Sequence, residues 1–317
     1  MVSELDDESR ELMDENRNFL PDFIVAPYFY LSPIRFMDWL RLTLECYRKT
    51  KQIETSIPVY LSLVISKEAI EDRSDEIARE VGALQPDGII LWIDCQVEED
   101  LSISELRRFI ALVRGLKNGT AKIINSHGGY FSTLLCHPQL ENLLDGAGHC
   151  INYGESRSVV PVGGGIPMAR FYFPVLHSRI RFGDALGIAR AKNWLDSPGS
   201  YRDNVCSCRQ CTELLDKSQS ANATFFEYGR SSPVTFSRRS GSIVSLEYPT
   251  KEAKQAAARH YLYNKAKEFN DVREKELREL ISDLENAFRE ISPYSGDDIA
   301  AHLNNWANVL RSLLPRD

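Results

Sequence analysis

Long apolar runs are missing from this sequence. Of its 317 residues, 43% are hydrophobic and 26% are charged, and no stretch reaches the ~18–20 apolar residues that a membrane-spanning helix needs. Its first residues, MVSELDDESRELMDENRNF, are acidic and polar, whereas a secretory signal is first basic and then apolar. The sequence therefore argues against a membrane span and predicts a cytoplasmic protein.

Cysteine is scarce, and its number is odd. Seven cysteines in a chain with no export signal argue against a disulfide framework and favour reduced thiols with some use in metal binding. Four are scattered among apolar neighbours and are expected to be small buried hydrophobes: Cys46, Cys95, Cys136 and Cys150.

An excess of positive charge is also missing, because the net charge is −7. The charge is uneven, however: residues 1–20 form an acidic segment, and arginines are enriched from residue 157 to residue 211. A local basic face on an acidic protein would fit this pattern. Arginines dispersed around solvated helices would explain it equally well.

Short apolar runs alternate with helical patterns from residue 22 onward, which is typical of βα units around a parallel sheet. The predicted strands cover residues 23–31, 57–65, 88–94, 121–126, 149–154 and 169–176. Amphipathic helices are expected between them, for example over 32–50 and over 102–116, which opens with a Ser-x-x-Glu capping pattern. No GxGxxG follows the first strand. The sequence thus predicts an α/β fold with a TIM-like (βα) barrel, compact or incomplete.

The most specific motif is VCSCRQC, which contains Cys206, Cys208 and Cys211. Three thiolates so closely spaced can converge on one tetrahedral zinc ion, whose fourth ligand must come from elsewhere in the fold. Only His260 and His302 follow this cluster. We prefer His260, because it lies on a predicted helix directly after the intervening loop. The sequence predicts a structural Zn²⁺, with redox-active or incidental cysteines as the alternative.

Three parts are expected along the chain: an acidic segment over 1–20, a catalytic barrel over 21–200, and a zinc-binding, helical subdomain over 201–317. Residues 217–242 are rich in Ser, Asn and Arg and are predicted to be a flexible loop or a β excursion. From Thr250 to the end the pattern is helical.

The cysteine cluster after a barrel, followed by a histidine in RHYLYNKAKEF, resembles the zinc-binding end of the tRNA-guanine transglycosylase superfamily, which includes relatives that exchange bases in DNA. The resemblance covers mainly residues 120–211 and 250–280. It implies a zinc-containing barrel that cleaves the N-glycosidic bond of a guanine in nucleic acid. One aspartate would act as the nucleophile and a second as acid and base.

The segment NSHGGYFSTLL looks like the family's DSGGFQ base-pocket motif. Gly128 and Gly129 would let the backbone approach a flat base, and Tyr130 or Phe131 could stack on it; a tight βα turn with core aromatics is the alternative. Ser126, followed by His127, stands where the family has its first aspartate, so that acid/base role is not carried over. The family's Asp-Cys-x-x-Pro-Thr-Arg motif has no clear counterpart.

Two carboxylates are the candidates for catalysis. Asp94 ends GIILWID, and Glu155 ends the strand before SRSVV; carboxylates at these ends of barrel strands point into one shared site. One would stabilise or attack the oxocarbenium-like sugar carbon while the other activates water. His127 would protonate or hydrogen-bond the departing base. A helix cap is the alternative role for Asp94.

The glycine run at 163–165 could hold a phosphate through backbone N–H groups. Cationic side chains flank it, namely Arg157, Arg170, His177, Arg179 and Arg181. Such groups fix a nucleic-acid backbone without reading its sequence. A structural role is the alternative for His177.

These motifs together predict an enzyme that cleaves the glycosidic bond of a flipped-out base in nucleic acid, with DNA preferred to tRNA. The leading version is a DNA glycosylase that removes a modified base, for instance in antiviral defence, because the paired aspartates of base exchange are missing. The alternatives are a tRNA or DNA guanine transglycosylase with shifted catalytic residues, and a non-catalytic nucleic-acid-binding protein on the same fold.

Overall fold

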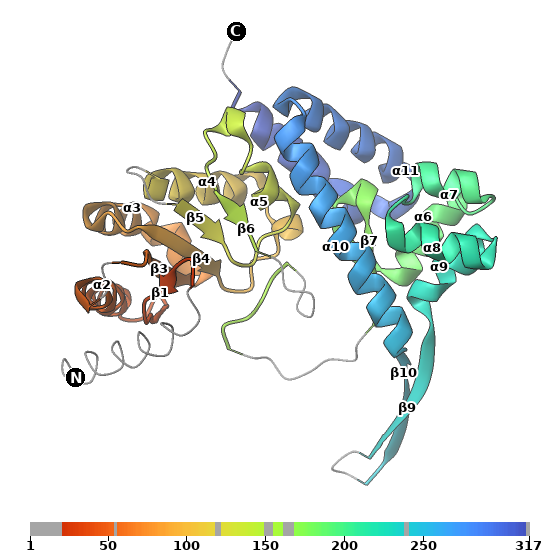
Figure 1. Cartoon of the computed structure of the whole chain (residues 1–317), viewed down its shortest axis with the longest axis horizontal. Helices are drawn as coiled ribbons and strands as arrows, with labels where there is room; N and C mark the ends of the chain where they lie inside the picture. Colours follow the sequence, from red (N-terminus) through yellow and green to blue (C-terminus); the bar gives the residue numbers. More distant parts are fainter. Residues whose placement is uncertain are drawn as a thin grey trace. The chain divides into compact units, whose positions relative to one another are not determined.

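The computed structural model describes residues 21–53, 56–117, 122–148, 155–160, 168–237 and 241–314, with the backbone alone for 295–298. The chain divides into two compact units, Met1–Pro161 and Val162–Asp317. Figure 1 labels the elements of both units. Among the helices that the structure describes, none combines the length and the apolar character that crossing a bilayer requires.

A parallel sheet forms the core of the first unit (Figure 1). Its strands run in the order β1 (Ile24–Val25), β3 (Val59–Ile65), β4 (Gly88–Ile93), β5 (Lys122–Asn125) and β6 (Gly146–Ala147), and β2 (Tyr30–Leu31) also pairs with β3. Every residue of β3, VYLSLVI, is buried. A parallel strand covered on both faces needs such a continuous apolar run. The predicted α/β class is confirmed.

Helices follow the strands of this sheet. The longer ones are α2 (Phe36–Ile53), α3 (Lys67–Leu84) and α4 (Ile103–Lys117), and α5 (Tyr130–Leu134) is a short helix after β5. The predicted capping pattern is confirmed, because the backbone N–H of Glu105 donates to the Ser102 hydroxyl and that of Ser102 donates to the Glu105 carboxylate. The described strands form an open path from β1 to β6.

Two predicted strands are not among the described strands of the parallel sheet. The strand over 149–154 lies outside the described residues. The strand over 169–176 is wrong as a further parallel strand: β7 (Arg170–Phe173) pairs antiparallel with β8 (Ser178–Arg181), and both belong to the second unit. The physical reason is the Pro174–Leu176 turn, which sends the chain straight back along β7.

Helices dominate the second unit: α6 (Phe182–Ala191), α7 (Pro198–Asn204), α8 (Arg209–Ser218), α9 (Ala221–Gly229), α10 (Lys251–Glu274) and α11 (Leu277–Arg311). The helical end of the chain is thus as predicted. This unit begins before residue 200, where we expected the second part, because Phe171 of β7 packs against Phe225 of α9 and His260 of α10.

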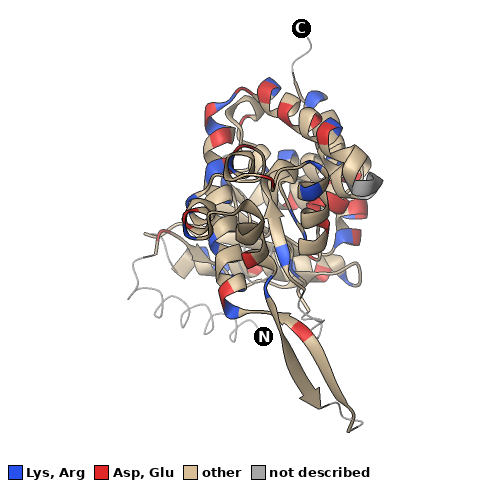
Figure 2. Cartoon of the chain, turned by 90° about the vertical axis from the view of Figure 1, so that its right-hand side faces the viewer, with Lys and Arg blue, Asp and Glu red and all other residues tan. Residues whose placement is uncertain are grey.

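The loop predicted over 217–242 is replaced in part by regular structure. Residues 221–229 form α9, because the Ser220 hydroxyl caps its first turn by accepting from the Ala223 N–H. The β excursion is confirmed as an antiparallel ribbon of β9 (Ser231–Ser237) and β10 (Ile243–Pro249). Figure 2 shows that the described part of this ribbon is nearly free of charged side chains.

Candidate functional site

Three cysteines and one histidine converge in the second unit. Each of Cys206, Cys208, Cys211 and His260 offers one ligand atom, and these atoms lie within 4.8 Å of one another. His260 Nδ1 is 3.5 Å from Cys208 Sγ and 3.4 Å from Cys211 Sγ. Tetrahedral zinc places sulfur and imidazole nitrogen ligands about 3.6 Å apart, given Zn–S of ~2.3 Å and Zn–N of ~2.0–2.1 Å. The cluster could therefore hold a metal ion.

Local structure explains why these residues meet. Cys208 is the N-cap of α8, and its backbone N–H lies 3.3 Å from Cys206 Sγ, which folds the short Cys-Ser-Cys segment back on itself. Cys211 follows in the first turn of the same helix. His260 comes from α10, where it is fully buried and stacks on the Phe171 ring at 4.5 Å. The cluster thus ties α8 to α10.

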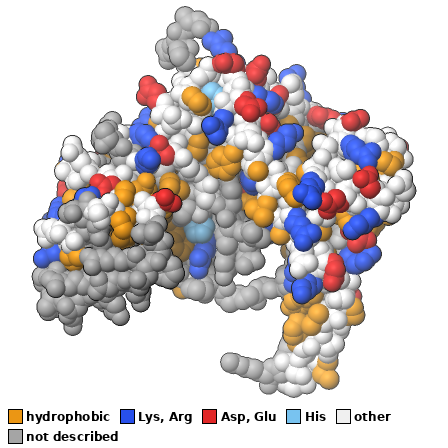
Figure 3. Space-filling model, viewed as in Figure 1, with side chains coloured by type: hydrophobic (Ala, Val, Ile, Leu, Met, Phe, Trp, Pro, Cys, Tyr) orange, Lys and Arg blue, Asp and Glu red, His pale blue; other side chains and the backbone are white. Residues whose placement is uncertain are grey.

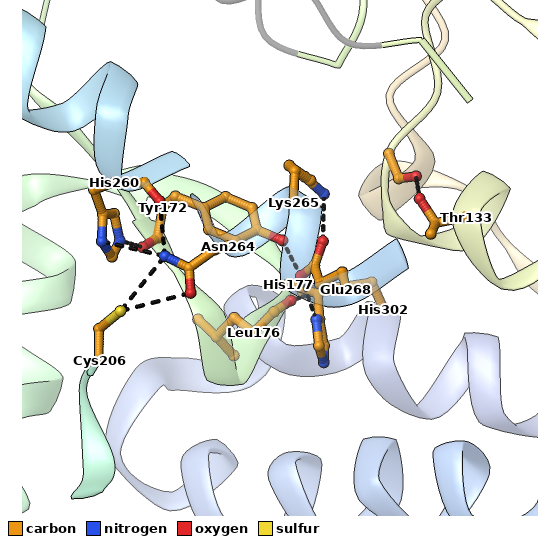
Figure 4. Close-up of polar contacts among 11 residues, drawn as sticks. Thr133, Tyr172, Leu176, His177, Cys206, His260, Asn264, Lys265, Glu268 and His302 are labelled. Atoms are coloured by element: carbon orange, nitrogen blue, oxygen red, sulfur yellow. Dashed lines mark hydrogen bonds and ion pairs between the residues drawn. The ribbon is translucent and has the colours of Figure 1, made fainter. Parts of the chain in front are cut away.

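Contacts around the ligands fix their orientation. His260 Nε2 lies 2.7 Å from the Tyr172 carbonyl oxygen, so this nitrogen donates and Nδ1 is left to face the sulfurs (Figure 4). The Tyr228 hydroxyl lies 3.1 Å from Cys211 Sγ and can donate to a thiolate. Burial of His260 favours its neutral form, but hydrogen bonds to Cys206 and Cys208 outweigh it and raise its pKa to about 9. This electron-rich surrounding suits a cation.

The other candidate ligand, His302, lies elsewhere in the unit. Its Nε2 is 2.8 Å from the Leu176 carbonyl oxygen, and its ring meets Trp306 edge-on at 4.6 Å. Burial lowers its pKa to about 4, so it is neutral and structural. The structure thus places His260, as predicted, and not His302, beside the three cysteines.

Replacing each histidine in turn tests this assignment. His260→Ala removes a ligand atom and is expected to abolish stoichiometric metal binding, whereas His302→Gln keeps a donor for the Leu176 carbonyl and should retain the ion. Metal content per chain, measured by elemental mass spectrometry after gel filtration, checks both. A metal-free His302→Gln protein beside a fully loaded His260→Ala protein would reverse the assignment.

A second polar cluster lies in the first unit, just beyond the ends of β4 and β5. Gly129 is the N-cap of α5, and a Cβ on it would lie 2.9 Å from Glu98 Oε2 and 3.0 Å from Glu155 Oε2. Because both oxygens lie so close to one point, they are no more than about 6 Å apart. Two carboxylates therefore meet at the second glycine of the predicted base-pocket motif.

Glu98 was not among the predicted site residues. It belongs to an acidic run, VEEDL, shortly after β4, and such runs are usually solvated. In the structure its side chain is 1% exposed and accepts from the backbone N–H of Ser132 at 3.1 Å and from the Ser132 hydroxyl. The Asn125 side-chain amide donates to the same hydroxyl at 2.9 Å. Only burial distinguishes Glu98 from its acidic neighbours.

Burial raises the pKa of Glu98 to about 7; the Ser132 hydrogen bonds oppose this, and the charge of Glu155 adds to it. The folded state therefore holds this proton more tightly than the unfolded chain, where the ordinary value is 4.5. The resulting stabilisation is complete below pH 4.5 and is lost as the pH rises through about 7.

We expect Glu98→Gln to remove this loss, because an amide does not ionise. As the pH rises from 4.5 to 8, the free energy of unfolding of the variant should increase by roughly 2–4 kcal/mol relative to that of the parent. Urea unfolding at a series of pH values measures the difference, with Glu99→Gln as the control from the same acidic run. Parallel pH profiles for the parent and Glu98→Gln would contradict the expectation.

An aromatic and cationic group lies at the same end of the sheet. The His127 ring meets Trp92 edge-on at 4.9 Å, and the Arg157 guanidinium lies over the Trp92 ring at 5.4 Å. Burial, and then the charge of Arg157, lower the pKa of His127, so its imidazole is neutral at pH 7. Its Nδ1 is buried and has no hydrogen-bond partner among the described residues.

Asp94 has contacts of a different kind. Its Oδ2 accepts from the Tyr30 hydroxyl at 2.8 Å, and its Oδ1 accepts from the backbone N–H of Val159 at 2.8 Å. These are the contacts of a residue that anchors the segment after Glu155. At Gly129 it is Glu98 that lies close to Glu155, whereas Asp94 accepts from Tyr30 and Val159.

At the glycine motif, the backbone of Gly128 lies close against the side chain of Ser132. A Cβ on Gly128 would lie 2.6 Å from Ser132 Cβ, so this position excludes a side chain. Tyr130 is 3% exposed and Phe131 is fully buried. Their burial fits the alternative that we left open, a tight turn followed by core aromatics, rather than a surface for base stacking.

The predicted phosphate-binding cations at 170–181 lie on the β7–β8 hairpin of the second unit. Arg170 and Arg181 are exposed and stand opposite each other in its register. The Arg179 guanidinium lies over the Tyr261 ring at 4.1 Å. The glycine run at 163–165 lies outside the described residues.

His177 has a structural partner. Its Nδ1 is 2.6 Å from the buried carboxylate of Glu268, which also accepts from the Tyr172 hydroxyl and lies 3.0 Å from Lys265 Nζ (Figure 4). The positive charge of Lys265 and these hydrogen bonds outweigh burial and keep the pKa of Glu268 at about 2. The network ties β7 to α10, so the structural alternative for His177 is the better supported one.

Comparison with known proteins adds no relative: no family model matches the chain, no curated protein matches its sequence, and no solved structure matches its fold. The features of this chain that bear on its function are therefore the cysteine–histidine cluster and the carboxylate cluster.

Proposed function

We propose that this protein cleaves the N-glycosidic bond of a base in nucleic acid, with Glu155 and Glu98 as the acting carboxylates. The meeting of two carboxylates at Gly129 is the observation that carries the proposal. Retaining glycosidases hold such a pair ~5–5.5 Å apart, whereas inverting enzymes need ~6.5–9.5 Å to admit water. An upper limit of about 6 Å favours the route through a covalent intermediate.

In this route the Glu155 carboxylate attacks the sugar carbon C1′. The C1′–O bond forms as the C1′–N bond breaks, and the base leaves with the bonding electrons and takes up a proton. Glu98, with a pKa of about 7, can hold that proton at neutral pH. Water then attacks C1′ and gives its proton to the Glu98 carboxylate as the C1′–O ester bond breaks, which restores Glu155 and Glu98 and leaves an abasic sugar. The neutral imidazole of His127 can hydrogen-bond the departing base.

Zinc is the ion that we propose for the metal cluster. Three thiolates and one imidazole are a common ligand set of tetrahedral structural zinc, and the ion would join α8 to α10 without taking part in chemistry. The Cys206, Cys208, Cys211 and His260 set also supports our proposal that the chain is a distant relative of the tRNA-guanine transglycosylase superfamily. Closure of the parallel sheet into a TIM-like barrel belongs to the same proposal.

A non-catalytic nucleic-acid-binding protein is the second candidate, and one observation favours it. Glu98 accepts from the Ser132 N–H in the first turn of α5, as a helix-capping carboxylate does. In that case the pair at Gly129 would stabilise the fold and cleave nothing.

Incubation with nucleic acids separates these functions. The substrates are DNA with modified guanines, unmodified DNA and tRNA; free base and abasic sites are measured by mass spectrometry, and base exchange by uptake of radiolabelled guanine. Free base with abasic sites supports hydrolysis, and uptake of label without abasic sites supports exchange. Binding without either product would leave the non-catalytic function.

A further inference from the structure

A groove crosses the surface of the second unit beside the metal cluster. Two hollows of about 380 and 610 Å³ share Arg209 and Tyr263 in their walls, so they adjoin. The first also contains Cys206 and Cys208 in its wall. Nothing in the proposed chemistry at Gly129 uses this groove.

One wall is a row of side chains on α10. Arg259, Tyr263 and Lys267 are spaced four residues apart, so they share one face of the helix with a rise of ~6 Å between neighbours. All three are exposed, Tyr263 by 41%. Within the part of the chain that the structure describes, neither Arg259 nor Lys267 forms an ion pair. The row is therefore an aromatic ring with a cation one turn away on either side; neither cation forms a close ion pair with a described residue, and Arg259 feels only the more distant charge of Glu213.

Two further cations, Arg202 of α7 and Arg209 of α8, line the first hollow and are only weakly paired. Arg209 lies 2.8 Å from Glu213, and Arg202 lies 3.1 Å from Asp216, in exposed ion pairs. Exposed pairs of this kind contribute little, so a phosphate could replace the carboxylate. Acidic side chains also stand in these walls, namely Asp203 in the first hollow and Glu213 in the second, and Figure 3 shows Lys and Arg side chains interspersed with Asp and Glu on the visible face of the second unit.

We infer that this groove binds single-stranded nucleic acid, with Tyr263 stacked on a base and Arg259 and Lys267 on the flanking phosphates. Alternating cations and aromatic rings are how proteins hold a single strand without reading its sequence. A duplex encloses its bases and would leave Tyr263 without a partner. The inference rests on the nucleic-acid substrate of the proposed function but is independent of its chemistry.

The first test measures the salt dependence of binding. A fluorescently labelled single-stranded 12-mer is titrated with the full-length protein at several salt concentrations, and anisotropy reports the affinity. Each phosphate contact on a single strand contributes ~0.7 to the log–log slope, so the Arg259→Ala/Lys267→Ala double variant should lower the slope by about 1.4. Lys254→Ala removes an exposed cation from the same helix outside the groove and should leave the slope unchanged.

The second test isolates stacking. Tyr263→Ala should weaken binding by about tenfold, and Tyr263→Phe, which keeps the ring, should restore it. A blunt duplex should bind more weakly and be insensitive to Tyr263, and a mononucleotide, with one phosphate, should bind more weakly still. An unchanged slope in the double variant, or equal affinities of Tyr263→Ala and Tyr263→Phe, would overturn the inference. Because these assays score binding without base release, a failure of cleavage leaves their outcome interpretable.

Discussion

Replacing Cys211 with serine is expected to release the metal ion and to unfold the second unit. Cys211 is fully buried, and its Sγ lies 3.4 Å from His260 Nδ1. A structural zinc site supplies folding free energy directly, of about 10–16 kcal/mol in zinc-finger peptides. Whole domains are stable by only ~5–15 kcal/mol, so the loss of the ion should exceed what the remaining packing can offset.

The measurement combines metal content with urea unfolding. The parent should contain one ion per chain, and a strong chelator should reproduce the effect of Cys211→Ser on it. Cys95→Ser is the matched control, since Cys95 is exposed in the first unit and lies outside the cluster. A Cys211→Ser protein with full metal content and the parental unfolding midpoint would show that the cluster does not hold the ion.

Glu155→Gln is expected to lower the rate of base release by two to three orders of magnitude while sparing the fold. Breaking the base–sugar bond develops positive charge on the sugar, and the Glu155 carboxylate both stabilises that charge and forms the new bond to C1′, whereas an amide does neither. The loss of one preorganised electrostatic group typically costs about 10²–10³ in rate. Glu98→Gln should lower the rate as well, because it removes the group that we assign to proton transfer.

Asp94→Asn serves as the matched carboxylate control. Asp94 anchors Tyr30 and Val159, so its replacement should affect the stability of this segment more than the chemistry and leave base release within about tenfold of the parent. Circular dichroism first establishes that each variant is folded. A Glu155→Gln protein with near-parental base release would remove the site at Gly129 from the mechanism. A greater loss in Asp94→Asn than in Glu155→Gln would restore Asp94 as the catalytic partner.

Local features of this protein are specified by its sequence far more directly than contacts between distant segments are. The cysteines of the metal cluster could be predicted from their short spacing. Cys206, Cys208 and Cys211 are close along the chain, so the sequence alone brings them near one point. The periodicity of apolar residues predicted the buried strand β3 and the apolar face of α2. A strand covered on both sides and a helix covered on one side have different apolar patterns in the sequence.

Contacts between distant segments were decided by the tertiary structure alone. The sequence favours Asp94, which ends a predicted strand, over Glu98, which belongs to the acidic run that follows, yet packing against α5 buries Glu98 and raises its pKa. His177 and Glu268 are 91 residues apart in the sequence, so no local pattern indicates that their side chains pair. A local pattern records residue type and spacing, whereas the protonation and the partner of a side chain depend on which remote segment removes it from water. The sequence by itself therefore determined the α/β class and the residues of the cluster that could hold a metal ion, and only the fold decided which carboxylates meet at Gly129.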